Sequence, residues 1–440
     1  MAAVGCARVE PVPLDSGRVL DDLRWTTLEA ALGRGQGTAG PFDPSDGLTV
    51  GEAVSVALIL NPDLGLARSE AGIAEAQLLS AGLFPDPEVD AGWVRLGGET
   101  QIGIALLQSL SHLWERPVRR ERARLRLEEV HHRIAAAEWD LAHAVRSGWA
   151  GLLAAGESTG FAEEALRLKG RLLRIMEDRL SLGAVAEMEA NLARMDHAEA
   201  QRRLRRAQGE ETWAWQAINR LLGVGPDVRF DLQAGTNPWE VRAVEFPIER
   251  LEDAAVSHRP DLAGLRAAYE QAEMAVQLAA RGRAPRLRAG PSYEREGGDE
   301  SAGAAASVEI PLWNRNRGEV AEMLARRETA EREFRLALAD VRSELAFVLA
   351  DLERLGAEVR YYEEDVLPRL GRNAEILEAA LLAGKFDVSA LLHLQNRLLE
   401  AREDAVGARL RYRQAANRLE TLVGVPLPEL GPAVREEGWS

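Results

Sequence analysis

Asn61-Pro62-Asp63-Leu64 and Arg259-Pro260-Asp261-Leu262 decide the fold, because they mark the same point in two copies of one unit. The two stretches lie 198 residues apart (259 − 61). The same spacing pairs Ala57 with Ala255, Ala74 with Ala272 and Pro87 with Pro285. Later in each copy, Gly183 matches Gly384 at a spacing of 201 residues (384 − 183). A drift of three residues (201 − 198) over this distance indicates an internal duplication, with copies at 48–248 and 249–426.

Each copy starts with a predicted helix, over residues 48–84 in the first and 249–283 in the second. The residue before a proline avoids the helical region. Asn61 and Arg259 therefore predict a bend or break near the start of each helix.

Alternating apolar and polar residues follow, and they predict β-hairpins over residues 86–110 and 285–312. Each hairpin would have one apolar and one polar face. Four strands are too few to close a barrel, and a sheet of this size has exposed edges. We therefore expect other chains to complete the sheet, or helices to cover it.

After each hairpin the pattern becomes helical, which predicts helical hairpins over residues 117–223 and 317–424. Residues 118–181 alone would span roughly 95 Å at about 1.5 Å per residue, too long for a compact domain to bury. Apolar residues follow the heptad spacing of coiled-coil seams, and many are alanines that let helices approach closely. Glycine can end a helix in a left-handed conformation, so we expect the turns at Gly183 and Gly384. One such seam consists of Val341, Leu345, Val348, Leu352, Leu355 and Val359.

The composition agrees with long helices and excludes some classes of protein. Of the 440 residues, 46% are hydrophobic and 5% aromatic, and Ala, Leu, Arg and Glu dominate. The 54 Lys and Arg residues against 70 Asp and Glu residues give a net charge of −16, which argues against a nucleic-acid-binding protein. No apolar run approaches the roughly 20 residues of a transmembrane helix.

Cys6 is the single cysteine, so neither an intrachain disulfide nor a cysteine metal cluster is predicted. The preceding Ala2-Ala3-Val4-Gly5 resembles the end of a bacterial lipoprotein signal, in which the cysteine is lipidated. The charged start of such a signal and most of its apolar stretch are missing. The alternative is a chance cysteine in the N-terminal segment 1–47.

No arrangement of residues predicts catalysis, a metal site or a cofactor. The seven histidines include no pair spaced i, i+4, and the methionines are scattered singly. His197 occupies a seam position, where a packed side chain is expected. We therefore predict that the protein is not an enzyme.

The order of helix, hairpin and long coiled coil, repeated twice, resembles the TolC family of bacterial outer-membrane efflux channels. The resemblance extends from Leu48 to Pro426. The string Ile310-Pro311-Leu312-Trp313-Asn314-Arg315-Asn316-Arg317-Gly318 is most similar to the CzcC-like branch, which is associated with heavy-metal cation efflux. At the matching junction, the first copy has Glu115-Arg116-Pro117 instead of Asn316-Arg317-Gly318, so its helix would start more stiffly.

The resemblance implies a mostly α-helical protein with a small β part. Three protomers would each give four strands to one twelve-stranded transmembrane β-barrel, and their long helices would form a periplasmic α-barrel. On the strands, the residues implied to face lipid are Val89, Ala91, Trp93, Ile102, Ile104, Leu106, Tyr293, Val308 and Ile310. The residues implied to line water are Glu88, Asp90, Gln101, Arg288, Ser292 and Glu309.

At the opposite end, the family implies hairpin tips that dock a periplasmic adaptor and close the channel. The matching residues are Arg179, Leu182 and Gly183 at the first tip and Leu382, Gly384 and Lys385 at the second. Asp387, together with Glu187, would form a ring of negative charge at the periplasmic gate, which favours cations.

The implied function is a passive export duct in the outer membrane, a homotrimer served by an adaptor and an inner-membrane pump of the RND type. Drug efflux and type I protein secretion use the same fold, and the sequence does not separate them from metal export. A soluble periplasmic coiled-coil scaffold is the alternative from another class.

Overall fold

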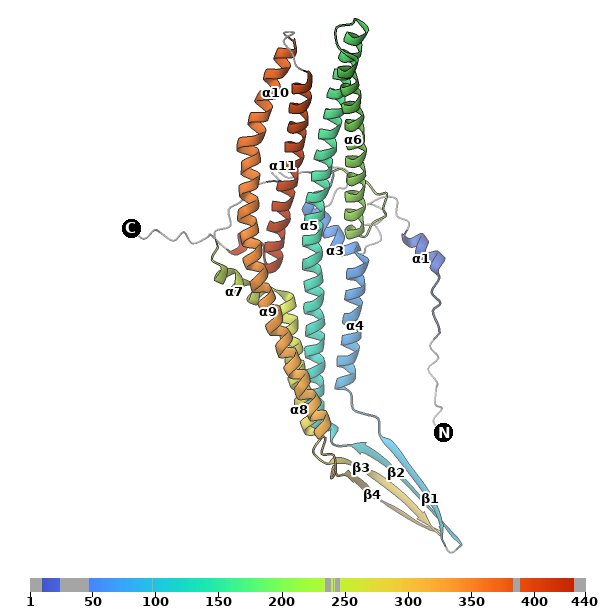
Figure 1. Ribbon diagram of the computed structural model, residues 1–440. Helices are drawn as coiled ribbons and strands as arrows, with labels where there is room; N and C mark the ends of the chain where they lie inside the picture. The colour runs from blue at the N-terminus through green and yellow to red at the C-terminus, as the bar shows by residue number, and fades with distance from the viewer. Residues whose placement is uncertain are drawn as a thin grey trace, which may run out of the picture. The chain divides into compact units, whose positions relative to one another are not determined.

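The computed structural model describes residues 10–23, 47–96, 98–233, 239, 241, 246–382 and 388–430 (Figure 1). It divides into two compact units. Unit 1 comprises Met1–Pro62, Leu141–Ala243 and Leu352–Asn417, and unit 2 comprises Asp63–Asp140, Val244–Asp351 and Arg418–Ser440.

The elements follow the predicted order twice. The first copy contains α3 (Val50–Leu60), α4 (Pro62–Gly82), β1 (Glu88–Leu96), β2 (Glu99–Ser109), α5 (His112–Ser181) and α6 (Glu187–Leu222). The second contains α7 (Ile248–His258), α8 (Pro260–Arg281), β3 (Arg286–Glu296), β4 (Asp299–Glu309), α9 (Arg317–Arg360), the π-helix η1 (Tyr361–Val366), α10 (Leu367–Leu382) and α11 (Val388–Val423). A short helix α1 (Ser16–Leu23) precedes the first copy, and a 3₁₀ turn η2 (Leu427–Leu430) follows the second.

The helix break before each proline is confirmed, and the structure shows why it recurs. In unit 1, α6 ends at Gly223, whose left-handed backbone (φ 74°) lies against the break. A Cβ on Gly223 would collide with the Leu60 carbonyl oxygen. Asn61 Nδ2 donates to the Leu221 carbonyl at 2.9 Å and fixes the joint.

The second copy repeats this joint within unit 2. Gly424 (φ 83°) lies against the backbone of His258 and Arg259, and a Cβ there would lie 2.9 Å from the Arg259 nitrogen. Arg259 Nη1 donates to the Leu422 carbonyl at 3.1 Å. In both copies, therefore, the last helix ends where the first one breaks.

The first long helix begins earlier than predicted, at His112 instead of after Pro117. Strand β2 leads almost directly into it, because the Leu110 N–H still donates to Leu287 in the sheet while the Leu113 N–H already donates back to Leu110. Pro117 lies inside the helix, where it removes one backbone donor.

The predicted seams are largely confirmed. Val341, Leu345, Val348, Leu352, Leu355 and Val359 are all buried. The buried face of α6 carries Ala190, Ala193, Ala200 and Ala207, which lets neighbouring helices approach closely. In α11, Leu399 is buried and the neighbouring Leu398 is half-buried. The main core of unit 1 joins α3, α5 and α6 through residues such as Val56, Leu152 and Ile218.

The helix of the second copy contains a π-turn that the sequence analysis missed. Pro368 has no N–H to donate to the carbonyl four residues before it. The α-helix changes to a π-helix at η1, just before this proline. There the Leu367 N–H donates to the Tyr362 carbonyl, five residues back. The signal was present as a proline inside a heptad pattern.

The strands form one antiparallel sheet in the order β1-β2-β3-β4, so that the two hairpins join along β2 and β3 (Figure 1). Pairing between β2 and β3 is interrupted between Ala105 and Gln108. Pro291 lacks an N–H here, and a Cβ on Gly290 would collide with the Leu106 carbonyl oxygen. Gly290 therefore permits the close approach that a proline in a central strand requires.

No single helix within the described ranges is long and apolar enough to cross a membrane; the bent pair α3 and α4 meets that test only when taken together.

The glycine joint can be tested by Gly223→Ala, which we expect to lower the free energy of unfolding by about 2 kcal/mol, because alanine disfavours the left-handed backbone and would collide with Leu60. Gly209→Ala is the matched control within α6. It has open space for a Cβ and should raise stability by about 1 kcal/mol. Thermal unfolding followed by circular dichroism measures both changes. Equal effects of the two substitutions would contradict the requirement for glycine at position 223.

Candidate functional site

The sheet of unit 2 has one apolar and one polar face, as predicted. Its register places Val89 opposite Leu106, Ala91 opposite Ile104 and Trp93 opposite Ile102. Ile104 in turn lies opposite Tyr293 on β3. These side chains therefore share one face across the hairpin boundary, which Val308 extends on β4. Ile310 lies one residue beyond the end of β4.

The apolar face is exposed in the single chain. Trp93 is 76% exposed and Val89 68%, and the larger apolar residues predicted on this face are all exposed. On the other face, Arg288 donates to Glu88 across the sheet. Strands β1 and β4 each have one unpaired edge within the described sheet. An apolar face without cover and two open edges require additional partners.

The first hairpin tip lies in unit 1, between α5 and α6. The Ala184 N–H donates to the Arg179 carbonyl at 2.8 Å, and the Gly183 N–H donates to Leu180 at 2.9 Å. With φ 68° at Gly183, this is the Schellman motif that ends a helix at a glycine. The predicted turn at Gly183 is confirmed. Leu182 is 81% exposed at its apex.

Only some of the other predicted site residues lie within the part of the chain that the structure describes. Glu187 is exposed at the first position of α6, and Leu382 is the last residue of α10. Gly384, Lys385, Asp387 and Cys6 lie outside the described residues.

Near the first tip, α6 carries an apolar stripe that the sequence analysis missed. Met188, Leu192 and Met195 are 70%, 43% and 70% exposed, and their i, i+4, i+7 spacing places them on one side of the helix. Together with Leu182 they form the tip surface. The spacing was visible in the sequence, but the stronger alanine seam on the same helix obscured it.

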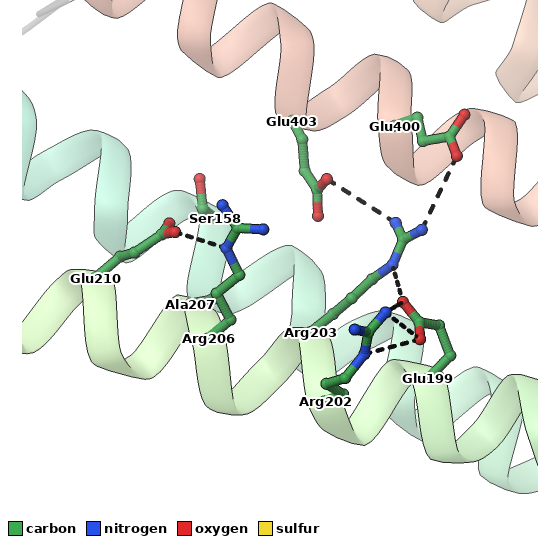
Figure 2. Close-up of a pocket in the computed structure, with 9 residues that line it drawn as sticks. All are labelled: Ser158, Glu199, Arg202, Arg203, Arg206, Ala207, Glu210, Glu400 and Glu403. Atoms are coloured by element: carbon green, nitrogen blue, oxygen red, sulfur yellow. Dashed lines mark hydrogen bonds and ion pairs between the residues drawn. The ribbon is translucent and has the colours of Figure 1, made fainter.

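A cavity of about 510 Å³ lies between α5, α6 and α11 in unit 1 (Figure 2). Arg203 on α6 spans it, with nitrogens 3.3 Å from Glu199, 3.9 Å from Glu400 and 4.0 Å from Glu403. Burial raises the pKa of Glu403, and Arg203 opposes that shift. The neighbouring Arg202 and Arg206 are also paired with carboxylates, so the cavity joins the two helical hairpins by charge and has no spare cation for an anionic ligand.

A buried network joins the same three helices nearer the tip. Lys169 on α5 is 3% exposed, and its Nζ lies 2.8 Å from Asp196 Oδ2 on α6. It also donates to Asn396 Oδ1 on α11, and Asn396 Nδ2 donates to Asp196 at 3.2 Å. Removing one partner of a buried ion pair destabilises strongly, so this network fixes how the helices align. Lys169 is one of only two lysines in an arginine-rich chain, a signal that the sequence analysis overlooked.

His143 on α5 is buried, 4% exposed. Burial, helped by the charge of Arg146, lowers its pKa to about 4. His197, which was expected to pack, is half-buried against Gly170 of α5. Within the described residues, no group of three or more His, Cys, Asp and Glu side chains could hold a metal ion.

Comparison with known proteins agrees with this architecture. Residues 251–425 match the family model of outer membrane efflux proteins. The cobalt-zinc-cadmium resistance protein CzcC of Cupriavidus metallidurans is 21% identical over 387 residues, covering 87% of this chain and 92% of that protein.

Two solved structures share the fold. The CmeC outer membrane channel of Campylobacter jejuni aligns with a TM-score of 0.71 at 15% identity, covering 86% of both chains. The outer membrane protein VceC of Vibrio cholerae aligns with a TM-score of 0.70 at 16% identity, covering 86% of this chain and 96% of that one.

The buried histidine predicts a pH dependence of stability. The folded state holds His143 neutral down to about pH 4, whereas the unfolded chain takes up a proton near pH 6.5. Stability is therefore lost as the pH falls from about 6.5 to 4, by at most about 3 kcal/mol from this residue. His143→Gln should flatten that part of the curve in urea unfolding experiments.

The control for this experiment is His131→Gln, at an exposed position of the same helix. Wild-type and His143→Gln curves that run parallel between pH 4 and 6.5 would contradict the prediction.

Proposed function

We propose that this chain, of which residues 251–425 match the family model of outer membrane efflux proteins, is the outer-membrane channel of a tripartite efflux system. It would act as a passive duct from a periplasmic adaptor to the exterior, with no chemistry of its own. Force and substrate selection would belong to an inner-membrane pump of the RND type, which the adaptor links to the channel.

The observation that carries the proposal is the sheet with an uncovered apolar face and two open edges. Open edges and unpaired backbone groups are not tolerated in a bilayer, whereas a closed barrel satisfies every strand. Three copies of the sheet would close a twelve-stranded barrel. The apolar face of the sheet, which includes Val89 and Ile310, would then contact lipid. The opposite face, which carries Glu88 and Arg288, would line the water-filled interior.

The helical hairpins would extend into the periplasm and dock the adaptor at their tips. Support comes from the tip surface, because Leu182 and the stripe from Met188 to Met195 leave apolar side chains in solvent at the end of a helical hairpin. Arg179 and Gly183 would shape this first tip, with Leu382, Gly384 and Lys385 at the second. Glu187 and Asp387 would ring the gate, and Cys6 would add a lipid anchor.

Heavy-metal cations are the substrate class we favour. The string from Pro311 to Gly318 and the similarity to a cobalt-zinc-cadmium resistance protein support it. Drug efflux and type I protein secretion remain the alternatives within the same fold. The scaffold hypothesis, from a different class, requires extraction into buffer without detergent.

The first experiment measures mass by light scattering and conductance in a planar bilayer, using detergent-extracted protein. We expect a trimer that forms stable, cation-preferring pores, because three open sheets are needed to close the barrel. A monomer or dimer that dissolves without detergent and conducts nothing would refute the channel and support the scaffold.

Docking at the tip can be tested with Leu182→Asp and Met188→Asp. Each places a charge in the tip surface, and we expect the affinity for the adaptor encoded with this protein to fall about tenfold or more. Trp213→Asp, at a 76% exposed apolar position far along α6 from the tip, is the control and should bind like the wild type. Unchanged binding by both tip variants, with trimers intact, would place docking elsewhere.

A further inference from the structure

The junction between sheet and helices in unit 2 concentrates positive charge in an otherwise acidic protein. Between the end of α8 and the start of β3, the sequence Arg-Gly-Arg-Ala-Pro-Arg-Leu-Arg (281–288) holds four arginines and no acidic residue. Arg315 and Arg317 add two more where the chain passes from β4 to α9. The protein as a whole carries a net charge of −16, so the charge of these two segments is opposite to that of the whole chain.

Hydrogen bonds bring the two basic segments together. Asn316 Nδ2 donates to the Ala279 carbonyl at 2.9 Å, which ties the start of α9 to the end of α8. A Cβ on Gly282 would lie 2.6 Å from the same nitrogen, so the two segments are in direct contact. Arg281 also donates to the Trp114 carbonyl and brings the start of α5 to the same place.

The backbone at this contact adopts a conformation that is unfavourable for residues other than glycine. Arg315 and Asn316 have φ angles of 47° and 52°, two consecutive non-glycine residues in the left-handed region. The Asn316 side chain compensates by donating to Ala279 and to Glu319 Oε2, the latter at 2.6 Å. Beside this turn, Trp313 is 92% exposed and Leu312 57%.

Most of these arginines lack an acidic partner. Arg283, Arg315 and Arg317 are exposed, and no carboxylate of the described residues forms an ion pair with any of them. Arg286 lies opposite Glu309 on the polar face of the sheet. This differs from parts of the helices, where exposed arginines such as Arg326 and Arg332 pair with glutamates one turn away. It also differs from the far end of the sheet, where Arg295 faces Glu300 at 4.0 Å.

We propose that this junction binds the phosphate groups of anionic phospholipids at the membrane surface nearest the helices. The guanidinium fork matches phosphate oxygens, and exposed Trp and Leu beside a basic cluster are typical of a membrane interface. The cluster lies next to the apolar sheet face, so a lipid could insert its chains along that face while Arg283, Arg315 and Arg317 hold its headgroup. The inference rests on the proposed function, because it requires the sheet to lie in a bilayer.

The test uses the purified full chain in neutral detergent, with phosphatidylglycerol or phosphatidylcholine of matched chains added in steps. Bound lipid is counted by native mass spectrometry and stabilisation by thermal shift. We expect the wild type to bind phosphatidylglycerol at least tenfold more tightly than phosphatidylcholine, and to lose the preference in 0.5 M salt. The variant with Arg283→Gln, Arg315→Gln and Arg317→Gln should bind both lipids alike.

The matched control removes three exposed arginines from further along α9, at Arg326, Arg332 and Arg335, and should keep the preference. If the triple junction variant does not assemble, Arg283→Gln and the pair Arg315→Gln with Arg317→Gln are measured separately, and each should lose part of the preference.

Three outcomes would overturn the inference. The junction variants could keep the full lipid preference, sodium phosphate could stabilise the wild type as well as phosphatidylglycerol does, or the variants could lose trimers without any change in lipid binding. If the protein still forms conducting trimers, each of these outcomes refutes the lipid site alone and not the proposed channel function. A protein that neither forms trimers nor conducts refutes the proposed function, and the inference with it.

Discussion

The backbone groups along β1 and β4 are the constraint on which the rest of the structure depends. Every strand edge needs hydrogen-bond partners, and a sheet of four strands has two edges that it cannot satisfy within one chain. The side chains add a second requirement, because one whole face of the sheet is apolar and exposed. Covering the face alone would leave the edges open, and pairing the edges alone would leave the face in water. A closed barrel within lipid meets both requirements, and residues 251–425 match the family model of outer membrane efflux proteins.

The two copies of the duplicated unit contain the same joint between helices, but a different side chain fixes it in each. In the first copy an asparagine side chain fixes the helix break to the end of the last helix, and in the second an arginine does so. The glycines at positions 223 and 424 are common to both, since each has a left-handed backbone and lies against backbone atoms of the break. The invariant part of the motif is therefore geometric, and the side chain that donates the hydrogen bond is exchangeable.

Sequence patterns predicted the features that local periodicity determines and missed those that depend on contacts between distant segments. The two helix breaks, the alternating faces of the strands and the glycine turn at Gly183 each have a local cause, and each was predicted. The interrupted pairing at Gly290 requires knowing that Leu106 lies opposite, and Lys169 requires knowing that Asp196 and Asn396 converge on it. The start of α5 at His112 instead of residue 117 also depends on distant contacts, because the hydrogen bond from Leu110 to Leu287 in the sheet determines where β2 gives way to the helix.

Charge is used differently in different parts of the molecule, and the net value of −16 conceals this. Along the helices, arginines alternate with glutamates at i, i+3 and i, i+4 and largely neutralise one another at the surface. Between the helices of unit 1, Arg203 and Lys169 are held among carboxylates and an amide, where they align the hairpins instead of binding a ligand. At the junction, by contrast, Arg283, Arg315 and Arg317 are exposed and form no ion pair with a carboxylate of the described residues. Charge left uncompensated beside an apolar face has the character of a binding surface, whereas the paired charges elsewhere serve to hold helices in register.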